Sequence, residues 1–311
     1  MRNRTLLVVL LAVCAASAAP ASAGVTAGVD QSFGTANYRG TKANASIDLS
    51  DSLYIAPSFS TYRHDSSSGS YYQPGLRVGY EFGPFSLGVQ GAFVPKHNGY
   101  KQNSVGADLT ISLAPGGTKH GHRMAGPSSQ SNETFGYGLA GVDAGVSVNH
   151  ITHSDDFTAA GPSGDALRLQ GGQRLKSFTV GETAFTVFAG AKFLITEVSA
   201  SLSKSLYDTS FDNRAVRESP FLSLGEFNAI EAGFPDASYN VKVKLKTLPF
   251  VRPFVSFTHT TFKLGSAPSN ATEVGGVLGL DMLSVKAAYG HYGQSGFRAR
   301  DYFTLGAAVN F

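Results

Sequence analysis

The chain of 311 residues has no tryptophan, a single cysteine and few charged residues, which make up 15% of the total. The lone cysteine, Cys14, lies near the N-terminus, so no disulfide and no cysteine-based metal site is expected in the rest of the chain. No Cys-x-x-Cys-His sequence occurs, which argues against covalently attached haem. The charges nearly balance, because the 25 basic residues fall to 23 without Arg2 and Arg4, against 22 acidic ones, and this favours no nucleic-acid partner.

Long apolar runs are also missing beyond the first 23 residues, where none approaches the roughly 18 residues of a transmembrane helix. The first 23 residues combine two arginines, the apolar stretch 6–13 and the small residues 21–23. This order is typical of a secretory signal peptide, so we expect a signal peptide over 1–23 and an exported chain over 24–311. A lipoprotein signal ending at Cys14 is the alternative, but Val13 fits it poorly.

The C-terminal residues alternate between large apolar and small or polar side chains. The apolar positions are Phe303, Leu305, Ala307, Val309 and Phe311. A period of two gives a strand with one apolar face, and a strand that meets lipid is stable only in a closed sheet, where every backbone amide has a partner. The pattern therefore predicts an all-β, closed antiparallel transmembrane barrel.

This ending also resembles the C-terminal assembly signal of bacterial outer-membrane β-barrel proteins, in which alternate residues before a terminal aromatic are hydrophobic. The resemblance is to the porin-like superfamily as a whole and identifies no single family. It implies a multi-pass protein of the Gram-negative outer membrane. The partners it implies are outer-membrane lipid, lipopolysaccharide and the barrel assembly machinery, and the membrane-insertion signal would be residues 303, 305, 307, 309 and 311.

Alternating segments recur along the whole chain and predict about 14 strands, although 12 or 16 would also return both ends of the barrel to the periplasmic side. The expected strands are 25–34, 42–50, 53–64, 71–82, 85–96, 102–113, 134–150, 166–180, 184–206, 237–248, 250–264, 271–281, 283–293 and 301–311. Short turns alternate with longer polar loops, as periplasmic turns alternate with external loops. Residues 114–133 have linker composition and fall on the periplasmic side, where such a long connection is unusual.

The interior pattern is clearest in residues 239–246, where lysines occupy every second position and apolar residues mostly lie between them. A lysine at the bilayer midplane costs about 2 to 4 kcal/mol, so these side chains are predicted to line the lumen. The alternative is a soluble sandwich with a solvated lysine face. The predicted basic wall consists of Lys242, Lys244, Lys246, Arg252, Arg168, Arg174, Lys176 and Arg77.

The longest expected loop, 207–236, mixes carboxylates with apolar residues, so it is not expected to extend freely into water. Our hypothesis is that it folds into the barrel mouth and sets acids against the lysines, as the constriction loop of porins does. The candidate acids are Asp212, Glu218, Glu226 and Glu231. The alternative is a surface loop that contacts a neighbour.

Catalysis is a minor alternative, suggested by His150, His153, Asp155 and Asp156 at the external end of one strand. No Gly-x-Ser-x-Gly nucleophile motif accompanies them, so we expect no enzyme activity. His120 and His122 lie in the long connection but are too few for a metal site. No cofactor is expected.

These features together favour a porin-like channel for passive diffusion of small hydrophilic solutes, with a mild anion preference from the basic wall. Interior glycines such as Gly79, Gly88 and Gly290 are expected to keep the lumen open, and tyrosines including Tyr54 and Tyr302 to form the interfacial girdles. The alternatives are an adhesive surface barrel that anchors external loops, and a hydrolase at the rim. The sequence does not identify the solute or the oligomeric state.

Overall fold

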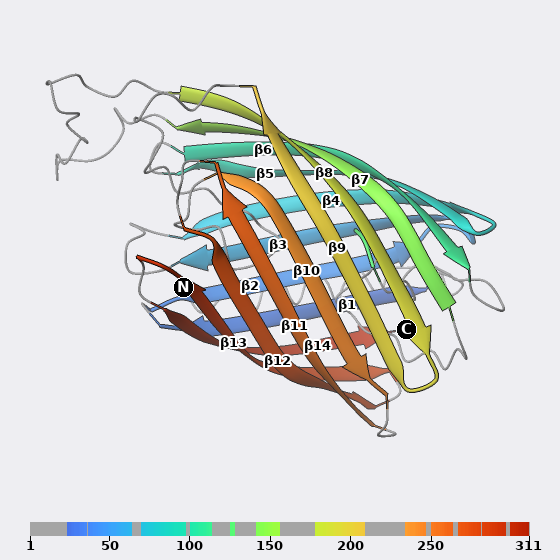
Figure 1. The fold of residues 1–311 in the computed structure, drawn as a ribbon. Coiled ribbons are helices and arrows are strands. Elements are labelled where there is room, and N and C mark those ends of the chain that lie inside the picture. Colours follow the sequence, from blue (N-terminus) through green and yellow to red (C-terminus); the bar gives the residue numbers. More distant parts are fainter. Residues whose placement is uncertain are drawn as a thin grey trace, which may run out of the picture.

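The computed structural model is a single closed antiparallel barrel of fourteen strands, in which each strand pairs with its neighbours in the chain and β1 pairs with β14 (Figure 1). The structure describes residues 24–35, 37–63, 70–97, 100–113, 125–127, 141–155, 178–208, 234–246, 250–263, 267–280, 282–296 and 299–310. Among these, no helix is long and apolar enough to cross a membrane. The predicted fold class and strand number are confirmed.

The strands are β1 (Val25–Gly34), β2 (Arg39–Asp48), β3 (Leu53–Arg63), β4 (Tyr71–Phe82), β5 (Phe85–His97), β6 (Tyr100–Leu113), β7 (Gly141–Asp155), β8 (Phe178–Phe193), β9 (Thr196–Tyr207), β10 (Pro235–Leu245), β11 (Val251–Phe262), β12 (Ser269–Leu280), β13 (Leu283–Gln294) and β14 (Arg300–Asn310). Twelve of them match the expected segments, with shifts at their ends. Short connections, such as 83–84 and 194–195, gather at one end of the barrel, together with the start of β1 and the end of β14. This is the end that faces the periplasm in outer-membrane barrels.

The two strands predicted at 166–180 and 184–206 were placed wrongly. The second segment is in fact a hairpin, because β8 ends at Phe193, a turn occupies 194–195 and β9 begins at Thr196. The predicted strand at 166–180 overlaps β8 only at its last residues, since β8 begins at Phe178. The turn residues Leu194 and Ile195 are apolar, so no glycine, proline or asparagine marked the reversal.

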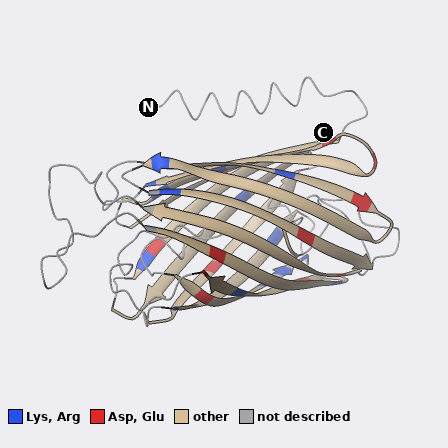
Figure 2. Ribbon diagram, turned by 90° about the horizontal axis from the view of Figure 1, so that it is seen from above, with Lys and Arg blue, Asp and Glu red and all other residues tan. Residues whose placement is uncertain are grey.

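Large apolar side chains cover the outside of the barrel along nearly every strand. In β4 and β5, for example, Leu76, Val78, Leu87 and Val89 are each at least 41% exposed. Charged residues are sparse along the strands, as Figure 2 shows. A continuous apolar exterior is unfavourable in water and suits the hydrocarbon of a membrane, where the closed ladder satisfies every strand's backbone amides.

The inner face carries small and polar residues, but several aromatic rings lie flat over its glycines. The Tyr54 ring lies over Gly79 and the Tyr302 ring over Gly290, so that a Cβ atom at either glycine would overlap the ring. Both tyrosines are buried, at 2% and 8% exposed, so their expected place in the outer girdles was wrong. The glycines make room for inward rings, which is a different role from opening the lumen.

The long connection between β6 and β7 lies at the short-turn end, as the strand count predicted. Its described part, residues 125–127, reaches the interior and lines the same cavity as the inward side chains of β7 and β8. Ala125 is buried, and Gly126 lies so close to the Phe188 ring that a side chain there would overlap it. Gly126 also has a φ of 83°, a conformation that favours glycine.

Candidate pore and its lining

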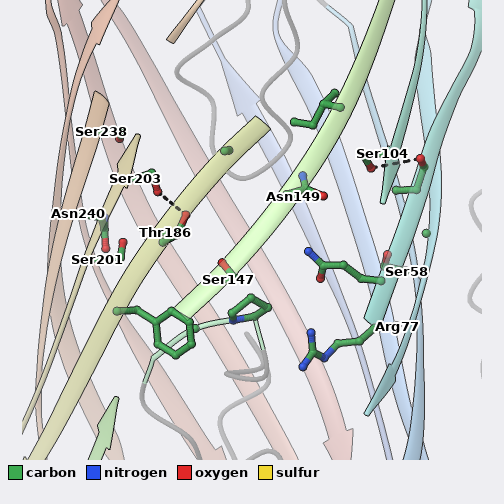
Figure 3. Close-up of a pocket in the computed structure, with 18 of the residues that line it drawn as sticks. Ser58, Arg77, Ser104, Ser147, Asn149, Thr186, Ser201, Ser203, Ser238 and Asn240 are labelled. Atoms are coloured by element: carbon green, nitrogen blue, oxygen red, sulfur yellow. Dashed lines mark hydrogen bonds between the residues drawn. The ribbon is translucent and has the colours of Figure 1, made fainter. Parts of the chain in front are cut away.

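The barrel encloses a cavity of about 830 Å³, lined by inward residues of β2 to β10 and by residues 125–127. This volume is within the range of sites that hold a small molecule. Figure 3 shows Arg77 and Ser58 on one side of the cavity and Asn240 and Ser238 on the other, and all four line it. The cavity is therefore an interior space between opposite walls of the barrel.

Uncharged hydroxyl and amide groups dominate the wall made by β7 to β10. The Thr186 and Ser203 hydroxyls lie 2.7 Å apart across β8 and β9. Asn240 donates from Nδ2 to the Thr258 hydroxyl at 2.7 Å. These cross-strand pairs hold the side chains in place while the remaining donors and acceptors of the wall face the cavity, where they can exchange hydrogen bonds with water or a polar solute.

The lysine stripe of β10 lies on the inner side, and a carboxylate of the neighbouring strand pairs with it. Lys242 and Lys244 line the cavity. Glu197 in β9 is directly opposite Lys244 and accepts from Lys244 Nζ at 3.0 Å and from Lys246 Nζ at 2.9 Å. The carboxylate that relieves repulsion within the stripe thus comes from the barrel wall itself.

Further inward charges, absent from the predicted wall, extend this basic side. Lys192 in β8 is directly opposite Glu197. Lys286 in β13 forms an ion pair with Glu273 at 3.0 Å. The nitrogens of Lys242 and Lys286 lie 4.5 and 5.3 Å from the centre of the Phe254 ring, close enough for cation–π attraction. The alternation of β8 and β13 could have revealed both lysines, but Lys192 and Glu197 belong to the hairpin that was predicted as one strand.

Arg77 and Arg252 of the predicted basic wall also point inward, and both are buried at 7% exposed. Arg77 Nη2 donates to both oxygens of Asp108 at 2.6 and 2.5 Å, and Nε donates to the Tyr54 hydroxyl at 3.1 Å. The guanidinium lies over Gly88, where any Cβ atom would overlap it. Arg77 is therefore one half of a buried ion pair, and its charge is compensated by a residue that the sequence pattern did not single out.

The other predicted site residues fall partly outside the described residues. This applies to Arg168, Arg174 and Lys176 of the basic wall, and to the candidate acids Asp212, Glu218, Glu226 and Glu231. Two carboxylates at the base of that loop are described. Asp208 accepts from the Gly181 amide at 2.9 Å, and Asp236 pairs with Lys204 and Lys263, which do not belong to the lysine stripe.

The two histidines at the external end of β7 lie on opposite faces of the strand, because successive residues alternate between the two faces. His150 is exposed and contacts the Thr183 hydroxyl at 3.1 Å, whereas His153 is buried and contacts Glu182 at 3.0 Å. The nearby Ser205 hydroxyl donates to Glu182 at 2.6 Å. Because Glu182 lies between the serine and the imidazole, this arrangement does not activate a nucleophile in the way that a serine–histidine pair does. Within the described residues, no group of three or more potential ligands could hold a metal ion.

The predicted insertion signal lies in β14, which closes the barrel against β1 and β13. Phe303 and Leu305 are 61% and 58% exposed and point outward. Phe311 lies outside the described residues. The signal's role in assembly stays a prediction.

No known protein family and no characterised protein matches the chain by sequence. Among solved structures, the chain is similar to CdiB from Acinetobacter baumannii, with 9% identity and a TM-score of 0.47 over 94% of this chain and 60% of CdiB. It is similar to Acinetobacter baumannii OccAB4, with 11% identity and a TM-score of 0.44 over 88% of this chain and 66% of OccAB4. The NanC porin gives 6% identity and a TM-score of 0.42 over 92% of this chain and 100% of NanC.

These likenesses concern the barrel architecture alone. The localisation follows from the barrel itself, because a closed sheet with an apolar exterior, short turns at one end and a polar interior is the architecture of outer-membrane proteins. The chain is a multi-pass outer-membrane barrel.

Proposed function

We propose that the barrel is a channel for passive diffusion of small hydrophilic solutes. The observation that supports this most directly is the cavity of about 830 Å³ inside a closed barrel, where hydroxyl and amide side chains alternate with small apolar ones along the lining. Barrels with a tightly packed interior leave no such space, and an aqueous lumen needs a polar lining. Since most of these groups are uncharged, neutral polar solutes are well accommodated.

A mild anion preference is the finer part of the proposal. The inner side of β8 to β11 carries Lys192, Lys242, Lys244 and Lys246, and Glu197 is directly opposite or paired with three of them. Fixed cations in a narrow pore raise the local concentration of anions, and one carboxylate offsets this only in part.

Single-channel recording in planar bilayers tests the proposal. The full chain, folded in detergent and shown by its heat-modifiable gel mobility to form a barrel, should give discrete conductance steps that persist at both voltage signs. Vesicles that contain it should swell in neutral sugars below a size limit. A folded barrel that gives neither conductance nor swelling would support the alternative of a membrane anchor for external loops.

Replacing Thr186 by tryptophan should lower the single-channel conductance by roughly a factor of two, because a large ring then projects into the pore from β8 and pore diameter limits permeation. The matched control is Val187→Trp, since Val187 is the next residue, is 53% exposed and points outward. Its conductance should equal that of the unmodified barrel. Equal conductance in both variants would contradict the assignment of the β8 inner face to the pore.

A further inference from the structure

Two arginines lie directly opposite each other at the external end of the barrel. Arg39 begins β2, Arg63 ends β3, and the two are register partners in the ladder. Both are exposed. Arg63 has the same strand parity as Phe59, whereas Tyr62 next to it is buried on the inner side, so the pair faces outward.

This arrangement is unfavourable without an anion, because like charges directly opposite each other in a sheet repel. Several other charged side chains of the strands have partners: Lys244 and Lys246 share Glu197, Lys204 pairs with Asp236, and Lys286 pairs with Glu273. Within the part of the chain that the structure describes, no salt bridge includes Arg39 or Arg63.

Outward aromatic residues show where the pair lies relative to the membrane. Phe33 is directly opposite Arg39 in the ladder and is 46% exposed, and Phe303 lies opposite Phe33 on the other side. Tyr72, 42% exposed, lies opposite Thr61 on the neighbouring strand, two residues below the level of Arg63, and packs on Phe59 at a ring distance of 6.2 Å. Aromatic belts mark the membrane–water interface, so the two guanidinium groups lie at the level of lipid headgroups.

We infer that Arg39 and Arg63 form a binding site for the phosphate of an outer-leaflet lipid, of the lipid A type. Opposed residues in a ladder have Cα atoms about 4.5 to 5.5 Å apart, so both guanidinium forks can reach one phosphate. Arginine binds phosphate through two parallel N–H donors, and a shared anion removes the repulsion between the two side chains. The outward position at headgroup level favours a lipid phosphate over a free ion, and the acyl chains would lie along the apolar outer face below.

The test measures lipid retained by the folded chain. Barrel freed of endogenous lipid is mixed with diphosphoryl lipid A in detergent, and bound lipid is counted by native mass spectrometry. The unmodified barrel should retain lipid A, and Arg39→Gln/Arg63→Gln should bind it about tenfold or more weakly, because two charge-assisted contacts are lost. Lipid A stripped of its phosphates should bind the unmodified barrel as weakly as intact lipid A binds the double variant.

The matched control is Lys101→Gln, since Lys101 is also exposed near the external end of its strand but lies opposite Ser154, an uncharged residue. This variant should retain lipid A like the unmodified barrel. If the double variant does not show barrel mobility on gels, Arg63→Gln alone is used, with weaker binding expected. Equal retention by the arginine variant and the unmodified barrel would overturn the site, and displacement of lipid A by equimolar inorganic phosphate would overturn its assignment to a lipid. Neither result depends on whether the barrel conducts.

Discussion

Replacing Asp108 by asparagine should lower the free energy of unfolding by about 3 to 5 kcal/mol, because it leaves the Arg77 guanidinium buried without its counter-charge. The side chains of Arg77 and Asp108 are only 8% and 2% exposed, so little water reaches the guanidinium to replace the lost carboxylate. The guanidinium also has no room to withdraw, since it lies over Gly88 and beside Tyr54. Urea titration of the folded barrel in detergent micelles, followed by heat-modifiable gel mobility, measures the loss.

Lys204→Gln provides the control, because it removes an ion pair with Asp236 in which the lysine side chain is 51% exposed. Exposed pairs contribute about 0 to 1 kcal/mol, so this variant should unfold close to the unmodified barrel. A second variant, Arg77→Met/Asp108→Leu, removes both charges together. It should recover most of the stability lost in Asp108→Asn, since an apolar pair of similar size leaves no buried charge. If Asp108→Asn proved as mild as Lys204→Gln, the pair would be effectively solvated from the lumen.

The barrel and most of its strands could be predicted from the sequence, because the alternation of large outward and small inward residues lies within each single strand. The predicted bounds of β1 and β4 match the structure, and the turn at 83–84 contains Gly83, which has a positive φ of 59°. The hairpin at 194–195 was missed because Phe193, Leu194 and Ile195 continue an apolar run across the reversal. A turn at the edge of a membrane can be apolar, so turn rules from soluble proteins fail there.

The inward positions of Tyr54 and Tyr302 could have been predicted from the alternation of residues along their strands. Tyr54 alternates with Ala56 and Ser58, which are on the small, polar face of β3. Tyrosine is common in interfacial girdles, so residue type predicts an outward ring at positions where strand parity predicts an inward one. The structure shows why an inward ring is tolerated, since each lies in the space that a glycine of the next strand leaves empty.

The pairing of charges could not be predicted, because it depends on register across several strands. Arg77 and Asp108 are 31 positions apart and belong to β4 and β6, with β5 between them. Their side chains come into contact over Gly88 of the intervening strand, and no local sequence pattern predicts this contact. The lysine stripe was recognisable because its period lies within one strand, whereas its carboxylate partner lies on another.

Exchanging Lys242, Lys244 and Lys246 for glutamate should reverse the charge selectivity of the pore. The change turns three positive charges of the lining into three negative ones, next to the carboxylate of Glu197. The reversal potential under a salt gradient should therefore change sign, from chloride preference in the unmodified barrel to potassium preference. High ionic strength should reduce the difference, because it screens charges in the water-filled lumen.

Glu197→Gln should shift the charge selectivity in the opposite direction, and by less, because it removes a single negative charge. It removes the carboxylate that lies within 3.0 Å of Lys244 and Lys246, so the selectivity for chloride should increase. Lys204→Glu is the control for charge alone, because Lys204 lies near the external rim with Asp236 as its partner and does not line the cavity. Its reversal potential should stay closest to that of the unmodified barrel. Potassium preference in the unmodified barrel, or an unchanged reversal potential in the triple variant, would show that the lysine stripe does not control the permeating ions.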